Sequence, residues 1–322
     1  MSVNLIVPKI ARRHRLAAVD VGTNTLRLLI ADVDQDHRIV PVAGEREMTR
    51  LGEGLIHSGR ISDAAIERSV KALSRFAERI REYPPERTAV VATSAVREAE
   101  NGADFVARVE AETGLDVSVI GGDEEARLTS LGAGSVLNGD RNDLLILDIG
   151  GGSTEFIHIK GGTRVGTCSV PLGVVTATER CISRAPAPMR ERYELDEYIR
   201  GHMETVRREL GNIGQVRLVA TAGTPTTLAA VDQEMVVYDP GRINNYRLAL
   251  GRVEELHDWL ADLSIRERAA VNGVEAGREE LIVAGCAILL RVMHDYQFGV
   301  VVVSDWGLRE GVLIDLFEQI GK

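Results

Sequence analysis

Two segments of the sequence place Asp-x-Gly, where x is any residue, directly after an apolar run long enough for a buried strand. The first copy reads LAAVDVGTNTL over residues 16–26, and the second reads LLILDIGGGSTE over residues 144–155. Successive backbone N–H groups in glycine-rich turns bind phosphate oxygens, and aspartate is a hard oxygen ligand suited to Mg²⁺. The repeat predicts a duplicated domain, with a phosphate and metal site in the cleft between the copies.

Each copy taken alone has a simpler explanation. The first is also typical of a β-hairpin turn whose aspartate bonds its own backbone, and the second of a flexible glycine loop. Three consecutive glycines lose much chain entropy on folding, and phosphate oxygens packed against bare backbone would explain them. The predicted phosphate-binding residues of the two turns are Gly22, Thr23, Asn24, Gly150, Gly151, Gly152 and Ser153.

Two adjacent glutamates lie between the copies, in the segment GGDEEARL over residues 121–128. Glu124 and Glu125 fall in the first turn of a predicted helix, where carboxylates commonly do no more than complement the helix dipole. Their position also allows one of them to face the cleft. A carboxylate beside a water molecule and a terminal phosphate would act as a general base for hydrolysis.

Two further segments carry candidate phosphate contacts. Arg97 follows a predicted strand over residues 88–92, where it could stabilise charge on a transferring phosphoryl group or simply pair with Glu98 on the surface. The segment ATAGTPTTLAA places Gly223 and Thr224 at a helix start. Such a start could receive a nucleotide or further phosphates, although an ordinary strand-to-helix turn explains it nearly as well.

The composition limits the classes of protein that the chain can represent. Its 322 residues suggest two domains, and its net charge of −10 argues against a nucleic-acid polymer as partner. The apolar runs are too short to span a bilayer, and residues 1–15 are the reverse of a signal peptide. Neither the seven histidines nor the three cysteines show zinc-ligand spacing. We expect a cytoplasmic protein without membrane contact.

Apolar periodicity predicts alternating strands and helices, which indicates an α/β fold with a mixed sheet in each domain. Ser62, Asn101 and Asp123 are predicted helix caps, while Pro84 and Gly114 are predicted helix ends. Strands are expected within residues 16–33 (two runs), 39–47, 88–92, 117–120, 144–148, 154–160, 163–170, 217–221 and 300–304. Helices are expected between residues 62 and 84 and over 101–112, 121–134, 189–210, 226–231, 250–260, 278–296 and 307–320.

Six sequence blocks, in their order along the chain, carry a family resemblance: AAVDVGTNTLRLLIA, ATSAVREAEN, GGDEEARL, LILDIGGGSTEF, ATAGTPTTLAA and VVSDWGLREGVL. They resemble the exopolyphosphatase/guanosine pentaphosphate phosphatase (Ppx/GppA) family of the actin-like ATPase superfamily. The resemblance implies two ribonuclease-H-like domains, with mixed sheets flanked by helices and the active site in the interdomain cleft. Domain I would comprise residues 1–127 and the C-terminal helix 305–322, and domain II residues 128–304. It also implies a homodimer.

Matched by position, the resemblance implies roles for single residues. Glu125 would be the catalytic base and Asp148 the carboxylate that organises Mg²⁺. Asp20 and Glu155 would be further carboxylates of the metal site, and Arg97 a phosphate contact. The expected activity is Mg²⁺-dependent exopolyphosphatase, in which water activated by Glu125 removes the terminal phosphate of inorganic polyphosphate.

Several alternatives stay open at this point. The substrate could be guanosine pentaphosphate (pppGpp) instead of polyphosphate. A sugar or other small-molecule kinase of the same superfamily is a second alternative, and a non-catalytic sensor of polyphosphate or an alarmone is a third. The loop Ala222-Gly223-Thr224 lacks the double glycine common in nucleotide-binding relatives, and the EEAR segment suits water as acceptor, so both features favour hydrolysis over a kinase.

Overall fold

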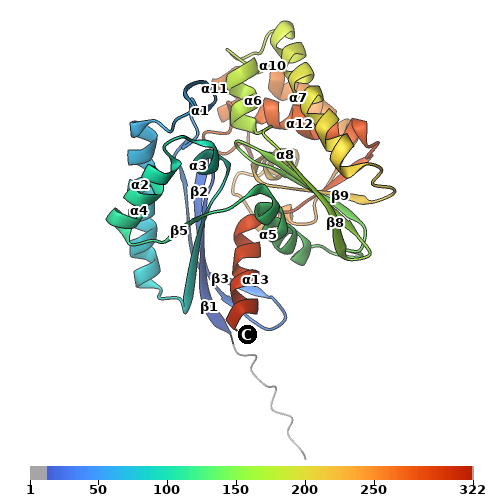
Figure 1. Ribbon diagram of the computed structural model, residues 1–322. Helices are drawn as coiled ribbons and strands as arrows, with labels where there is room; N and C mark the ends of the chain where they lie inside the picture. Colours follow the sequence, from blue (N-terminus) through green and yellow to red (C-terminus); the bar gives the residue numbers. More distant parts are fainter. Residues whose placement is uncertain (1–12, 321–322) are drawn as a thin grey trace, which may run out of the picture.

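The computed structural model of the protein describes residues 13–320 (Figure 1). Two mixed β-sheets form its centre, each flanked by helices. The expectation of no signal peptide, and the outermost ends of predicted domain I, concern residues 1–12 and 321–322 and lie outside the described part. Among the described residues, no helix is both long enough and apolar enough to cross a bilayer.

The first sheet has the strand order β3-β2-β1-β4-β5. Its central strand β1 pairs antiparallel with β2 and parallel with β4. The strands are β1 (His14–Val21), β2 (Thr25–Val33), β3 (Ile39–Met48), β4 (Arg87–Ala92) and β5 (Val117–Val119). Because β1 is covered on both faces, it reads as a continuous apolar run that ends at Asp20.

The second sheet repeats this plan and adds one edge strand, in the order β10-β11-β9-β6-β7-β8. Strand β6 pairs antiparallel with β7 and parallel with β9, as β1 does with β2 and β4. The strands are β6 (Leu144–Ile149), β7 (Thr154–Lys160), β8 (Thr163–Val170), β9 (Arg217–Thr221), β10 (Arg247–Ala249) and β11 (Val300–Val303). Asp20 and Asp148 therefore occupy equivalent places near the ends of the two central strands.

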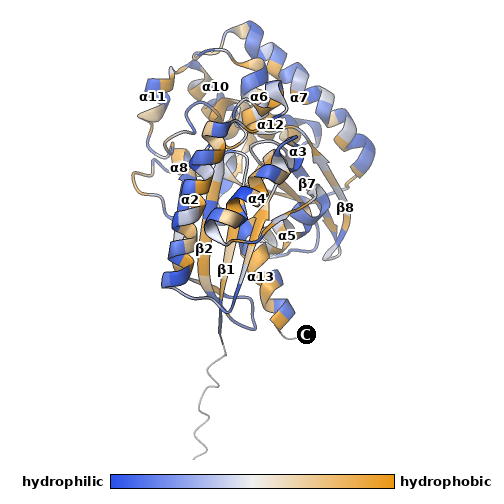
Figure 2. Ribbon diagram, turned by 60° about the vertical axis from the view of Figure 1, so that its left-hand side comes forward, coloured by the Kyte–Doolittle hydropathy of each residue, from blue (hydrophilic) through white to orange (hydrophobic). Residues whose placement is uncertain are grey.

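The helices of the first half cover one face of the first sheet. Phe76 and Leu73 of α2 and Phe105 of α4 pack with Val19 and Leu28 of the strands. Ser62 caps α2 as predicted, since its side chain accepts a hydrogen bond from the Ala65 backbone N–H at 3.3 Å. The helices here are α1 (Leu55–Ser58), α2 (Asp63–Glu82), α3 (Ser94–Glu98) and α4 (Gly102–Thr113). Figure 2 shows hydrophobic colour concentrated on β1 and β2 and hydrophilic colour on the outer helices.

The helices of the second half enclose the larger core. Leu195, Ile199 and Met203 of α7 pack with Leu289 of α12 and Leu147 of the sheet. The helices around this core are α6 (Val174–Cys181), α7 (Met189–Leu210), α8 (Gly223–Asp232), α9 (Pro240–Ile243), α10 (Leu250–Asp262), α11 (Ile265–Ala269) and α12 (Ile282–Asp295). Two further helices, α5 (Gly122–Ser135) and α13 (Leu308–Ile320), lie outside it.

Helices α5 and α13 lie side by side between the two sheets (Figure 1). Helix α13 packs on β1 and β2 through Val312 and Leu313, whereas α5 covers β6 and β7 through Ala126 and Ala133. The contact between the helices is backbone to backbone, because a Cβ added at Gly132 would lie 1.9 Å from the Gly307 carbonyl oxygen. The predicted fold class is confirmed, while the predicted domain boundaries stay a prediction.

Three predicted helix starts are wrong. Helix α5 is capped at Gly121 and places Asp123 inside its first turn, where the carboxylate complements the dipole instead of capping the helix. Helix α8 starts at Gly223, three residues earlier than predicted, and α12 starts at Ile282, later than predicted, because residues 278–281 form turns. The short helix α6 was not predicted.

Candidate active site

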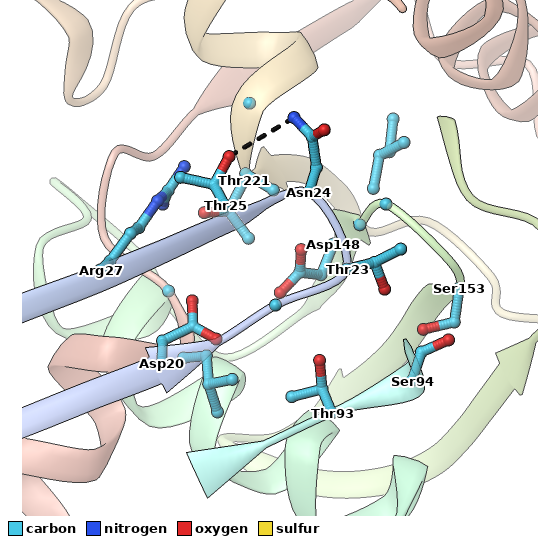
Figure 3. A pocket seen from close by; sticks show the side chains of 18 of the residues that line it. Asp20, Thr23, Asn24, Thr25, Arg27, Thr93, Ser94, Asp148, Ser153 and Thr221 are labelled. Atoms are coloured by element: carbon cyan, nitrogen blue, oxygen red, sulfur yellow. Dashed lines mark hydrogen bonds between the residues drawn. The ribbon is translucent and has the colours of Figure 1, made fainter. Parts of the chain in front are cut away.

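A cavity lies where the two Asp-Gly turns meet, at the ends of the central strands β1 and β6 (Figure 3). Its lining comes from both halves of the molecule. The residues are Asp20, Gly22, Thr23, Asn24, Thr25, Arg27, Thr93, Ser94, Glu125, Asp148, Ile149, Gly150, Gly151, Gly152, Ser153, Val174, Thr221, Ala222, Gly223, Arg278, Asp305, Gly307, Leu308, Arg309 and Glu310.

Gly22 and Gly150 serve the same purpose in the two turns. A Cβ at Gly22 would lie 3.0 Å from the Thr25 carbonyl oxygen, and one at Gly150 would lie 2.9 Å from the Ser153 carbonyl oxygen. The Gly150 backbone N–H donates to that Ser153 oxygen at 3.0 Å. The glycines are therefore needed to close each turn on its own backbone, whatever ligand the turn receives.

Gly151 and Gly152 allow the two halves of the molecule to touch. A Cβ at Gly151 would lie 2.8 Å from the Thr23 Cβ atom, and one at Gly152 would lie 2.3 Å from the Ser94 Oγ atom. Thr23 and Ser94 belong to the first half, so the second glycine loop packs directly against it. This contact explains two of the three consecutive glycines, and the binding of phosphate by their N–H groups stays a prediction.

Five carboxylates line the cavity (Asp20, Glu125, Asp148, Asp305 and Glu310), and a sixth, Glu155, lies beside it. Glu155 stands opposite Asp148 in the β6–β7 register and is almost fully buried. The Thr129 hydroxyl donates to Asp148 Oδ2 at 3.1 Å. The Ser169 hydroxyl donates to Glu155 Oε1 at 2.8 Å. Hydroxyl donors on neighbouring elements thus fix the orientation of the two carboxylates of the second sheet.

Burial raises the pKa of Asp20, Glu125, Asp148 and Glu155. Burial raises the pKa of Glu125 well above its usual range, and the charges of Glu155 and Asp148 raise it further. Burial, with the charge of Asp148, raises the pKa of Glu155 to about 7. Burial also raises the pKa of Asp20 to about 6, against the attraction of Arg27. Such a cluster favours the binding of a cation or of a proton.

Arg97 holds Glu125 from behind the cavity. Its Nη1 atom donates to Glu125 Oε2 at 3.1 Å and to the Ile120 carbonyl oxygen at 2.8 Å. Arg97 does not line the cavity itself. In this structure the arginine is a partner of the carboxylate, and a direct contact with phosphate would require its side chain to move.

Three arginines that the sequence prediction missed line the cavity: Arg27, Arg278 and Arg309. Arg278 is 7% exposed, and burial together with the charges of Arg27 and Arg46 lowers its pKa to about 10. Arg309 forms an ion pair with Glu310 at 2.6 Å. Arg27 alone had a signal in the sequence, because it is a charged residue inside an apolar strand, directly opposite Asp20.

The start of helix α8 lies against Arg278. A Cβ at Gly223 would lie 1.7 Å from an Arg278 guanidinium nitrogen, so only glycine leaves room for this arginine. Ala222 adopts a left-handed backbone conformation with φ of 71°. Thr224 points elsewhere, since its hydroxyl packs against Gly285 of α12, and it does not line the cavity. The helix start thus contributes Gly223 to the cavity and leaves Thr224 in the core.

The acidic side of the cavity fits Mg²⁺ as an open site. Asp20 and Asp148 both face the cavity, and Glu155 is the neighbour of Asp148. Within residues 13–320, no three His, Cys, Asp or Glu side chains are grouped closely enough to enclose an ion by themselves. Mg²⁺ is usually held by one or two carboxylates, with water and substrate phosphate oxygens as its other ligands. The donor set suits an ion shared with a phosphate group.

Comparisons with known proteins point to one family. A family model described as the Ppx/GppA phosphatase family matches residues 29–320. Exopolyphosphatase 2 of Mycobacterium tuberculosis is 32% identical over 314 residues, which cover 94% of this chain and 98% of that protein.

Solved structures give the same result for the fold. The crystal structure of the Ppx/GppA family member of Aquifex aeolicus superposes with a TM-score of 0.81 at 31% identity, covering 97% of this chain and 100% of that one. An exopolyphosphatase from Cytophaga hutchinsonii superposes with a TM-score of 0.87 at 27% identity, covering 95% and 98%. With sequence and fold matched over nearly its whole length, the chain belongs to the Ppx/GppA phosphatase family.

Proposed function

We propose that the protein is an exopolyphosphatase, which hydrolyses the terminal phosphate of inorganic polyphosphate with water activated by Glu125. The observation that carries the proposal is the position of Glu125. This buried carboxylate is held by Arg97 at 3.1 Å and faces a cavity lined by two glycine turns and three arginines. The relatives named exopolyphosphatase support polyphosphate as the substrate class.

The reaction needs no covalent intermediate. Water attacks the terminal phosphorus, its proton passes to a Glu125 carboxylate oxygen, and the bridging P–O bond breaks to release orthophosphate and the shortened chain. Glu125 must be deprotonated before the attack. Its raised pKa makes the carboxylate a stronger base than an exposed glutamate, which suits general-base catalysis near neutral pH.

The remaining lining residues would bind and orient the polyanion. Arg27 and Arg278 carry the positive charge that a polyphosphate chain requires, and the turn N–H groups of both halves offer uncharged donors. Asp20 and Asp148, with Glu155 nearby, would hold Mg²⁺. When bound, the ion would neutralise non-bridging phosphate oxygens. Together these groups would stabilise charge on the transferring phosphoryl group.

A phosphate-release panel tests the proposal. Purified protein is supplied with Mg²⁺ and, in separate reactions, with tripolyphosphate, longer polyphosphates and pppGpp. We expect orthophosphate from the polyphosphates, and its loss when EDTA removes the ion. Release from pppGpp alone would assign the alternative substrate. Binding of polyphosphate without any release would contradict hydrolysis and favour a sensor, and ATP-dependent phosphorylation of an added alcohol would favour a kinase.

A further inference from the structure

A second cavity of about 470 Å³ adjoins the active site, between helix α1 of the first half and helices α6 and α7 of the second. We call it the side cavity. It is lined by Thr23, Gly52, Leu55, Ile56, Gly59, Ser94, Glu98, Gly152, Pro171, Thr176, Arg180, Tyr198 and His202. None of the roles described above uses its outer part.

The wall between the two cavities is a single layer of small residues. Thr23, Ser94 and Gly152 line both cavities. Gly152 approaches the two hydroxyls so closely that an added Cβ would lie 2.3 Å from Ser94 Oγ and 2.9 Å from Thr23 Oγ1. The side chains of Thr23 and Ser94 therefore form part of the boundary between the two cavities. The Ser94 hydroxyl donates a hydrogen bond to Glu98 Oε1 at 2.8 Å, and Glu98 also lines the side cavity.

The wall lies at the end of the active site where orthophosphate would form. In Figure 3, Arg27 lies on one side of Asp148, and Ser94 and Ser153 lie on the other. Arg278 is close enough to Arg27 for the two charges to interact. Glu125 is tied through Arg97 to helix α3, which begins at Ser94. If the proposed function holds, the terminal phosphate reacts beside Ser94 while the remaining chain occupies the arginine end.

A passage through the side cavity would lead this phosphate to solvent. Its inner residues Thr23 and Ser94 are buried, whereas Glu98, Pro171 and Arg180 at its outer part are exposed. The Arg180 guanidinium lies over the Tyr198 ring at 5.0 Å, so the outer part of the side cavity carries a positively charged side chain. The volume of about 470 Å³ leaves room for orthophosphate together with water.

We propose that orthophosphate leaves the active site through the side cavity, past Thr23 and Ser94, while the shortened polyphosphate stays bound at the arginine end. Orthophosphate would then leave without passing the polyphosphate chain that is still bound. Arg180 would attract the departing anion at the outer part of the passage. This inference rests on the proposed function, because it requires that orthophosphate be formed at Glu125.

Two substitutions that avoid the catalytic residues test the passage. Leu55→Trp places an indole in the side cavity, and Arg180→Glu reverses the charge of an exposed residue, so the second variant leaves the core untouched. The controls are Val236→Trp and Arg184→Glu, which introduce the same residue types at exposed positions that do not line the side cavity. Tripolyphosphate with Mg²⁺ is the substrate, and rapid acid quench measures phosphate formed while a fluorescent phosphate-binding protein measures phosphate released.

Each variant should form its first phosphate at the wild-type rate and release it about fivefold or more slowly, so that a burst appears in the quenched samples only, as expected when product release limits turnover. The controls should show no burst. Equal formation and release in both variants, at wild-type rates, would overturn the passage while leaving the proposed function intact. Absence of any phosphate formation in the wild-type protein would instead contradict the proposed function, and the passage with it.

Discussion

At the scale of single residues, six carboxyl groups and three arginines share one cavity region. Asp20 and Asp148 stand at equivalent places on the two central strands, but the duplicated sheets differ at the next strand. The residue opposite Asp20 is Arg27, and the residue opposite Asp148 is Glu155. The strand pair of the first sheet therefore places a positive charge beside its aspartate, whereas the strand pair of the second sheet places a second carboxylate there.

The raised carboxyl pKa values predict that the metal-free protein loses stability as the pH rises. Between about pH 4 and pH 6 the folded protein holds the Asp20 proton more tightly than the unfolded chain does, because burial raises the pKa of this group to about 6. Ionisation of Asp20 should lower the free energy of unfolding by about 1–3 kcal/mol across this window, allowing for its partial exposure. The measurement is urea unfolding in EDTA at pH 5 and pH 7.5.

The Asp20→Asn variant provides the comparison, because its side chain cannot ionise. It should lose less stability than the wild-type protein over the same pH interval, whereas an identical loss in both proteins would show that Asp20 does not carry the effect. Mg²⁺ should restore stability at pH 7.5, since an ion that binds only the folded protein stabilises it.

Ala222 gives a second prediction at this scale. Its φ of 71° and ψ of −165° lie in a region that glycine tolerates and alanine does not. Ala222→Gly should raise the free energy of unfolding by about 1 kcal/mol, because relief of this strain outweighs the greater entropy of glycine in the unfolded chain. Ala222→Val should lower it. Urea unfolding of both variants checks the order, and a less stable glycine variant would contradict the argument.

At the scale of secondary-structure elements, the contact between α5 and α13 brings the two halves together next to the site. Glu125 lies in the first turn of α5, and Arg309 and Glu310 lie in the first turn of α13. The two helices approach through Gly132 and Gly311, where no side chain separates their backbones. The glycines therefore set the distance at which these catalytic-cavity residues face one another.

Two glycines of α5 give a matched test of this contact. Gly132→Ala adds a methyl group 1.9 Å from the Gly307 carbonyl oxygen, and should lower the free energy of unfolding by about 1–3 kcal/mol through overpacking. Gly134→Ala, on the same helix, meets nothing within 4 Å, and should raise it by up to about 1 kcal/mol through better helix propensity. Thermal or urea unfolding compares the two. An equal change in the free energy of unfolding for both variants would show that the two helices can move apart without loss of stability.

Periodicity in the sequence predicted most of the elements, since the strands are short apolar runs and the long helices have clear apolar faces. Helix α7 begins and ends where predicted, at Met189 and Leu210. The start of α5 was not predictable, because Gly121 caps it through extended backbone while Asp123 is the usual capping residue type. Helix α6 was not predicted because its eight residues are fewer than the sequence window over which apolar periodicity identifies a helix.

The site could be predicted only in part, for a related reason. Asp20, Asp148 and the glycine turns carry a local signal, since each follows its own strand. Arg278 and Arg309 reach the cavity through tertiary packing from segments near the C-terminus, and no local pattern sets them apart from surface arginines. The position of Glu125 beside Arg97 likewise depends on contact between α5 and α3.

At the scale of the whole molecule, duplication explains why the cavity lies where it does. Two sheets of the same topology present the ends of their central strands to each other, and α5 and α13 fill the space between them. Both halves contribute charged residues to the lining of the cavity. A cytoplasmic location and a homodimer stay predictions. In the proposed function, the turns and the arginines would hold phosphate and Glu125 would act on water.

Comparison of two neighbouring glutamates tests this account most directly. Glu125 faces the cavity, whereas Glu124 pairs with Arg127 at 2.7 Å and does not line the cavity. Orthophosphate release from polyphosphate is measured for Glu125→Gln and Glu124→Gln under the same Mg²⁺ concentration. Glu125→Gln should lower the rate by a factor of about 10²–10⁴, the usual contribution of a positioned base, and Glu124→Gln should retain about the wild-type rate. Wild-type release from a folded Glu125→Gln protein would contradict the central claim.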